Sequence, residues 1–321
     1  MKVIKVSKQG YCNGVKRALD IVKNTIDNNY HNKQIYILGN IINNSFVSEQ
    51  LTKLGVITLN TPNKSRLELL NEIEGDSIVV LTAHGVSPKI ISYLNEKEIT
   101  YVDATCPFVL KVSDRIVNYI KRGYDIIYLG KSNHPESEGV LGINEEKIHL
   151  VTNIKDIDNL NITNSNVLVD TQTTLSDFKT KPLLKHIKQK YPQVIIASGV
   201  CNATTARQQA LIEEISGQLC LVVGDKISSN ANELLEIGNQ FIPTYLVNSI
   251  NDIKKEWLDE VSVITLTSAA STPDELVDEI YNYLTKIAWL LTLFFYSNLN
   301  YIIIIIFINF FNCLSNFILI F

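Results

Sequence analysis

The 321-residue sequence has no CxxC pair, and its cysteines are odd in number and widely scattered. The five are Cys12, Cys106, Cys201, Cys220 and Cys313. A disulfide framework shows closely spaced cysteines in even number, so this pattern argues against one and indicates a reducing compartment. The first residues enter a strand pattern at once, without a visible targeting peptide. We therefore expect a cytoplasmic protein.

Two common nucleotide-binding signatures are also missing. No GxGxxG occurs, and Gly130-Lys131-Ser132 does not complete a P-loop, because Asp125 stands where that motif needs glycine. The formal net charge of −4 gives no electrostatic reason to expect a nucleic-acid partner. Nicotinamide, ATP and nucleic-acid functions thus have no support in the sequence.

Three of the cysteines share one recurring context. Around each of Cys12, Cys106 and Cys201, a β-type run ends in a short turn, followed by the cysteine and a helical pattern. Their separations are 94 and 95 residues. A thiol before a helix faces the positive end of the helix dipole, which favours the thiolate and metal ligation. We infer pseudo-threefold repeats that each present one cysteine to a shared centre.

The number of these cysteines bears on the kind of metal site. Three thiolates cannot close a tetrahedral zinc site, whereas on a 4Fe–4S cluster they leave one iron open to a substrate. The sequence therefore favours an iron–sulfur centre. The alternative is that each cysteine is a small buried residue, as we expect for Cys220 and Cys313.

Strand and helix patterns alternate along most of the chain. Short apolar runs at 35–38, 78–81 and 126–129 are typical of buried strands, and the stretches between them are too long for hairpins. This predicts an α/β fold with mostly parallel sheets, arranged as three similar domains in a pseudo-threefold trefoil around the cluster. The predicted boundaries are 14–103, 104–198 and 199–285, with an N-terminal strand in 1–13 joining the third domain.

An apolar tail follows at residues 286–321. No residue after Lys286 is charged, and Ile302–Ile306 is an unbroken isoleucine run. The length permits one membrane span of roughly 20 residues. Five asparagines interrupt the tail and would be costly in lipid. Two interpretations stay open, an extraneous segment and a tail anchor that would place the protein at a membrane.

Polar side chains follow the ends of several predicted strands, where parallel sheets carry their active groups. Hydroxyls, amides and imidazoles with few cations suit a compact anion such as diphosphate. A histidine near a carboxylate, as in His134 and Glu136, suits proton relay. The alternative for the serines and asparagines is helix capping.

Eight motifs together resemble the LytB-type family of 4-hydroxy-3-methylbut-2-enyl diphosphate reductases, iron–sulfur enzymes of the non-mevalonate isoprenoid pathway. The resemblance covers residues 1–284. The motifs are GYCNGVKRA (10–18), AHGVS (83–87), DATCP (103–107), HPESEG (134–139), TQTTLS (171–176), CNATTARQ (201–208), SSNAN (228–232) and ASTP (270–273).

The resemblance implies reduction of the allylic diphosphate to isopentenyl and dimethylallyl diphosphate, with electrons from a ferredoxin or flavodoxin. It implies one 4Fe–4S cluster per chain, held by Cys12, Cys106 and Cys201. The implied diphosphate ligands are Asn43, His84, Ser228, Ser229, Asn230 and Ser271. The residues implied at the substrate hydroxyl are His134, Thr173 and Glu136, with Glu136 as the proton source.

Two positions depart from the family pattern. The family usually has histidine at the position of Asn43 and glycine at that of Ala269. Asparagine can donate a hydrogen bond but cannot become cationic, which predicts weaker substrate binding. Alanine is strained if the backbone there needs a positive φ, which would disturb Ser271. These departures leave an alternative open, a non-catalytic iron–sulfur sensor or a degenerate paralogue.

Restoring the family residue tests the first departure. Asn43→His should lower the KM for the allylic diphosphate and leave the chemical step in place, because the imidazolium adds a positive charge to the anion site. Anaerobic steady-state kinetics measure both quantities. An unchanged or raised KM would count against this role of position 43.

Overall fold

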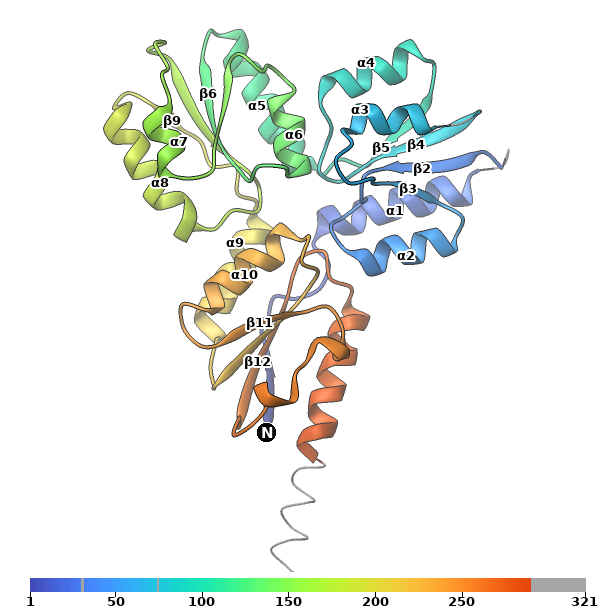
Figure 1. Ribbon diagram of the computed structural model, residues 1–321, viewed down its shortest axis with the longest axis vertical. Helices are drawn as coiled ribbons and strands as arrows, with labels where there is room; N and C mark the ends of the chain where they lie inside the picture. The colour runs from blue at the N-terminus through green and yellow to red at the C-terminus, as the bar shows by residue number, and fades with distance from the viewer. Residues whose placement is uncertain (30–31, 74, 290–321) are drawn as a thin grey trace, which may run out of the picture.

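The computed structural model describes residues 1–29, 32–73 and 75–289. This part of the chain contains three four-stranded sheets whose strand pairs are all parallel. Figure 1 shows them as three lobes around a common centre. The predicted α/β trefoil with parallel sheets is confirmed. The predicted domain boundaries stay a prediction, and most of the predicted tail, residues 290–321, lies outside the described residues.

The three lobes contain the following elements. The first lobe has β2 (Gln34–Leu38), β3 (Ile57–Leu59), β4 (Ser77–Leu81) and β5 (Thr100–Asp103), with α1 (Asn13–Asp27), α2 (Ser45–Lys53), α3 (Arg66–Leu69), η1 (Leu70–Glu72) and α4 (Pro88–Glu96). The second has β6 (Asp125–Leu129), β7 (Ile148–Val151), β8 (Val167–Thr171) and β9 (Ile195–Ile196), with α5 (Pro107–Lys121), α6 (Pro135–Leu141), α7 (Ile154–Asn159) and α8 (Asp177–Lys190). The third has β1 (Lys2–Lys5), β10 (Leu219–Val223), β11 (Thr244–Val247) and β12 (Val263–Ser268), with α9 (Asn202–Glu214), α10 (Ser229–Gly238), η2 (Ile250–Asp252), η3 (Lys255–Trp257) and a helix over 274–289.

The sheets repeat one strand order. The orders are β3-β2-β4-β5, β7-β6-β8-β9 and, for the third lobe, β11-β10-β12-β1. In the first two lobes, the edge strand beside β4 or β8 is β5 or β9, and each of these is the last strand of its lobe in the sequence. In the third lobe this place is taken by β1 from the N-terminus, which Figure 1 shows running into the lower lobe. The chain is therefore a threefold repeat that begins with the last strand of its last unit.

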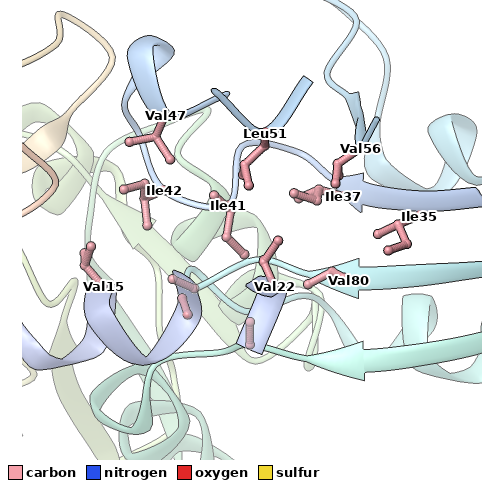
Figure 2. Close-up of a cluster of buried hydrophobic side chains, with 13 residues drawn as sticks. Val15, Val22, Ile35, Ile37, Ile41, Ile42, Val47, Leu51, Val56 and Val80 are labelled. Atoms are coloured by element: carbon pink, nitrogen blue, oxygen red, sulfur yellow. The ribbon is translucent and has the colours of Figure 1, made fainter. Parts of the chain in front are cut away.

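Each sheet is covered by apolar side chains on both faces. In the first lobe, α1 packs Val15, Ala18 and Val22 against Ile37 and Val80 on one face (Figure 2), and a second cluster covers the other face. The other two lobes also have two clusters each. The i, i+3, i+4, i+7 spacing of apolar residues explains why α1 forms and which side it buries.

Some short elements were not predicted. The edge strands β3 and β11 have three and four residues and are only partly buried, so they lack the continuous apolar run that marks a central strand. Within the described residues, the helices are too short or too polar to cross a membrane.

Charged contacts join the second and third lobes. The fully buried carboxylate of Glu233 in α10 lies 2.9 Å from Lys131 Nζ and 3.0 Å from Lys179 Nζ, and accepts a hydrogen bond from the backbone N–H of Ser176. Burial disfavours the charged form, yet the lysines and the hydrogen bonds hold the pKa of Glu233 below its usual value. The ionised carboxylate therefore stabilises this junction between lobes.

Replacing this carboxylate by an amide tests that statement. Glu233→Gln should lower the stability at pH 7 by about 1 kcal/mol, roughly 2 °C in Tm, because both lysines are partly exposed and screened. A lowered folded-state pKa gives stability that is present above the unfolded pKa, about 4.3. The difference from wild type should therefore shrink as the pH falls below 4.

Thermal unfolding at pH 7 and pH 3.5 measures both effects. Glu236→Gln is the matched control. Glu236 lies on the same helix as Glu233 and also contacts Lys179, but it is half exposed. An equal loss of stability in the two variants would contradict the role of Glu233.

Candidate functional site

The three spaced cysteines lie where the chain passes from one lobe to the next. Cys12 follows β1 of the third lobe and is the N-cap of α1 in the first. Cys106 lies between β5 and α5 and is the N-cap of α5. In the same way, Cys201 lies between β9 and α9 and is the N-cap of α9. All three are free thiols of intermediate exposure. Each thiol is therefore held between two lobes at the start of a helix.

One backbone hydrogen bond recurs at all three cysteines. The N–H of Cys12 donates to Ala270 O (3.3 Å), that of Cys106 to Ala83 O (3.0 Å) and that of Cys201 to Thr173 O (3.1 Å). Each acceptor lies in the loop that follows the third strand of a sheet, β12, β4 or β8. The cysteine positions are thus tied to the polar loops at the carboxyl ends of the strands.

The three thiols line one cavity of about 110 Å³. Gly14 shows how closely they approach the chain: a Cβ at this position would lie 2.6 Å from Cys106 Sγ and 3.8 Å from Cys12 Sγ. Among the described residues, no three Cys, His, Asp or Glu side chains converge tightly enough for a single metal ion. Three separated thiols around a shared cavity fit a multinuclear cluster better than one zinc ion.

The thiols differ in their surroundings. Cys201 Sγ accepts the backbone N–H of Thr204 (3.4 Å) and lies 3.2 Å from the Thr204 hydroxyl. Burial raises the pKa of Cys106, although the N–H groups of Phe108 and Val109 oppose this. The helix N–H groups therefore favour the Cys106 thiolate, as expected, while burial without a bound group opposes it.

A second set of equivalent positions follows β2, β6 and β10, which hold the same place in the three sheets. Asn43, His134 and Ser228 each lie four residues after the glycine that directly follows one of these strands, and all three line the cavity. His134 and Ser228 are the N-caps of α6 and α10. Among the serines and asparagines of the predicted site, Ser228 is therefore a helix cap, and it also lines the cavity.

The N-terminus of α10 carries the hydroxyl and amide groups. Ser228 Oγ accepts the N–H of Ala231 and lies 3.2 Å from Ser271 Oγ. Asn230 Oδ1 accepts the N–H of Ala270, while its Nδ2 is buried without an acceptor in the described chain. Oriented N–H groups, hydroxyls and an orphaned amide donor at a helix N-terminus form a site for an anion.

Two histidines face each other in the cavity wall. The rings of His84 and His134 meet edge to face, with centroids 5.6 Å apart. Burial, then His134 and Arg66, lower the pKa of His84 well below its usual range. Burial, with Lys131 and Arg66, lowers the pKa of His134 to about 4. Both imidazoles are therefore neutral at pH 7 in the free protein, and the buried Nδ1 of His84 has no partner among the described residues.

His134 has a defined tautomer because of its hydrogen bond. Its Nδ1 accepts the backbone N–H of Glu136 at 3.1 Å. The neutral ring must then carry its proton on Nε2. This leaves an N–H donor on the side of the ring away from its own backbone.

Glu136 is a buried carboxyl held by Thr173. The N–H of Thr173 donates to Oε1 and its hydroxyl donates to Oε2, both at 2.8 Å, and Tyr128 Oη lies 3.4 Å from Oε1. Burial raises the pKa of Glu136 to about 7, against these hydrogen bonds, which lower it. A carboxyl that titrates near neutral pH in a cavity suits general acid catalysis.

All twelve predicted site residues line this one cavity. Its lining contains no lysine or arginine. Three further residues contact the site residues but were not among the site residues predicted from the sequence. Thr174 Oγ1 lies 2.9 Å from Ser229 Oγ, Thr204 contacts Cys201, and Tyr128 contacts Glu136. The TQTTLS and CNATTARQ motifs contain the two threonines, whereas Tyr128 lies in an apolar strand and has no sequence signal.

Ala269 is not strained. Its φ is not positive, its side chain is fully buried, and its N–H donates to Val223 O at 3.0 Å. The condition under which alanine would disturb Ser271, a positive φ, is therefore not met.

The sequence profile of the LytB protein family matches residues 3–285. This chain belongs to the LytB protein family. A Bacillus pumilus relative, named 4-hydroxy-3-methylbut-2-enyl diphosphate reductase, is 40% identical over 288 residues, which cover 88% of this chain and 90% of the relative. A Lysinibacillus sphaericus protein of the same name is 38% identical over 289 residues, covering 89% of this chain and 88% of that protein.

Solved structures place this LytB chain among the same relatives. The E-1-hydroxy-2-methyl-but-2-enyl-4-diphosphate reductase of Plasmodium falciparum has a TM-score of 0.82 and 33% identity, covering 88% of each chain. A structure of (E)-4-hydroxy-3-methyl-but-2-enyl diphosphate reductase, described as the terminal enzyme of the non-mevalonate pathway, has a TM-score of 0.62 and 26% identity. It covers 89% of this chain and 100% of that one.

Gly14 offers a test of the thiol arrangement in this LytB protein. Gly14→Ala should abolish most iron binding, because the new Cβ would displace Cys106 Sγ. The fold should persist, since alanine is favoured over glycine in a helix by about 1 kcal/mol. Iron and sulfide content after anaerobic purification, together with Tm, measure the two effects. Lys16→Ala, at an exposed position of the same helix, is the control, and full iron content in the Gly14 variant would refute the close approach.

Proposed function

We propose that this chain is a 4-hydroxy-3-methylbut-2-enyl diphosphate reductase that forms isopentenyl and dimethylallyl diphosphate. The observation that carries the proposal is one cavity lined by three free thiols, an anion site of neutral donors and a buried carboxyl. The relatives named for this activity match nearly 90% of the chain.

Cys12, Cys106 and Cys201 would hold one 4Fe–4S cluster. When bound, such a cluster supplies electrons, and three protein thiolates leave one of its irons open. A ferredoxin or flavodoxin would deliver the two electrons that the reaction consumes. Free thiols in a reducing compartment suit a cytoplasmic location.

The diphosphate would lie at the N-terminus of α10. Ser228, Ser229 and Asn230 supply donors from this helix, and Ser271, His84 and Asn43 supply donors from the neighbouring loops. The binding of an anion favours the protonated imidazoles, so His84 and His134 would gain positive charge only with substrate present.

Glu136 would provide the proton for the leaving hydroxyl. With the proton on Oε2, its nearest partner is Thr173 Oγ1 at 2.8 Å, and this hydroxyl can pass a proton onward. His134 Nε2–H would orient the substrate hydroxyl. Two electrons and two protons then convert the allylic alcohol into the two alkenyl diphosphates and water.

Glu136→Gln tests the acid. Turnover should fall by at least about 100-fold, because a general acid contributes about that factor or more, while iron content stays at the wild-type level. Since the acid must be protonated, wild-type kcat should decline as the pH rises through about 7. An anaerobic assay with iron quantification measures both quantities.

Glu145→Gln is the control for Glu136→Gln, because this carboxylate is exposed and does not line the cavity. Full turnover in the Glu136 variant would reject Glu136 as the proton source. A protein with a cluster but no reductase activity would indicate an iron–sulfur sensor instead.

A further inference from the structure

Three of the five arginines lie on the three helices that the cluster cysteines cap. Arg17 is in α1, Arg115 in α5 and Arg207 in α9. Each donates to a backbone carbonyl in the loop before a different cysteine. Arg17 Nη1 bonds Thr105 O at 3.0 Å, just before Cys106.

The other two arginines repeat this contact around the centre. Arg115 Nη2 bonds Ser198 O at 3.3 Å, in the loop before Cys201. Arg207 Nη2 bonds Gly10 O and, at 3.4 Å, Gln9 O, in the loop before Cys12. The contacts close a ring: the helix after each cysteine holds the loop before the next (α1, α5 and α9 in Figure 1).

The sequence uses arginine sparingly, with 24 lysines among its 29 basic residues. The guanidinium is planar, permanently charged and able to bond two carbonyls at once, whereas an ammonium group is a point charge that burial neutralises more readily. Arginine therefore suits a contact with backbone carbonyls at a junction between lobes, and the contact of Arg207 with Gly10 is buried.

Arg207 differs from Arg17, which is exposed, in its burial, and from Arg115 in its charge environment. It is only 6% exposed, and its Nη1 also bonds Ala203 O at 3.1 Å. The part of the chain that the structure describes offers it no carboxylate ion pair and no acceptor for its buried Nε. By contrast, Asp170 neutralises Arg115 through contacts of 2.6 and 2.9 Å.

Three groups near Arg207 can carry negative charge, the thiols of Cys12 and Cys201 and the carboxylate of Asp274. Cys12, Cys201 and Asp274 favour its charged form, while burial opposes that form and lowers the pKa of Arg207. A buried cation is costly without counter-charges, so the thiolates of a loaded site would stabilise Arg207 in addition to Asp274. Arg207 does not line the cavity, and its hydrogen bonds go to the loop before Cys12 and to Ala203 in its own helix.

We propose that Arg17, Arg115 and Arg207 form a ring of positioning residues for the three thiol loops, and that the charge of Arg207 favours the reduced state of the bound cluster. The inference rests on the proposed function, because it requires the cluster. Residues that hold metal ligands in place change metal affinity about tenfold to a hundredfold. Net charge around a cluster sets its reduction potential.

Iron release tests the positioning role. Arg207→Gln should release iron to a chelator at least about tenfold faster than wild type, and Arg17→Gln should change the rate in the same direction by a smaller factor. Arg122→Gln is the control, because Arg122 stacks on Tyr119 at the far end of α5. Equal release from all variants and wild type would overturn the ring.

The reduction potential tests the charge. Arg207→Gln should make reduction about tenfold less favourable, a shift of about 59 mV to lower potential for one electron, while Arg207→Lys keeps the wild-type potential. Potentiometric titration followed by electron paramagnetic resonance measures this without substrate. An unchanged potential in a fully loaded Arg207→Gln variant would overturn the charge role.

The Arg207→Lys variant distinguishes the outcomes in which Arg207→Gln folds without iron. If Arg207→Gln folds without iron but Arg207→Lys loads a cluster at the wild-type potential, the charge role is supported. If both fold without iron, the charge role is overturned and only the hydrogen bonds matter. A wild-type protein without any cluster would overturn the proposed function together with the ring.

Discussion

The site depends on one hydrogen bond made three times, from the backbone N–H of a cysteine to the loop after a third strand. This bond joins the element that holds the thiol to the element that holds a polar side chain. Ala83 precedes His84, Ala270 precedes Ser271, and Thr173 is itself a site residue. The distance between thiols and anion donors is thus set by backbone geometry and by rigid parallel sheets, not by flexible side chains.

The cavity is lined by neutral hydrogen-bond donors and not by fixed cations. The lining has no lysine or arginine, although its expected contents are an anionic cluster and a diphosphate. Fixed cations in the wall would pair with whichever anion arrived first. Neutral donors at a helix N-terminus and two uncharged imidazoles bind an anion without that permanent attraction. The permanent charge of Arg207 lies behind the wall, near the thiols.

The sequence predicted the features that depend on spacing. Equal separations of Cys12, Cys106 and Cys201 indicated three repeats, and strand–helix alternation predicted the parallel sheets. It could not predict features that depend on three-dimensional context. The burial of the Cys106 thiol opposes the effect of the helix N–H groups on it, and the backbone at Ala269 has a conformation that alanine accepts. The tautomer of His134 and the contacts of Arg207 arise between segments far apart in sequence.

The place of β1 in the third sheet has a consequence for how the molecule assembles. β1 pairs with β12, about 260 residues later in the chain. Closing so long a loop is slow compared with forming the local contacts within the first two lobes. During synthesis the first strand must wait for nearly the entire polypeptide before it finds its neighbour. The pocket that the three thiols line is therefore complete only after translation of the third lobe, and that lobe needs both ends of the repeat in order to fold.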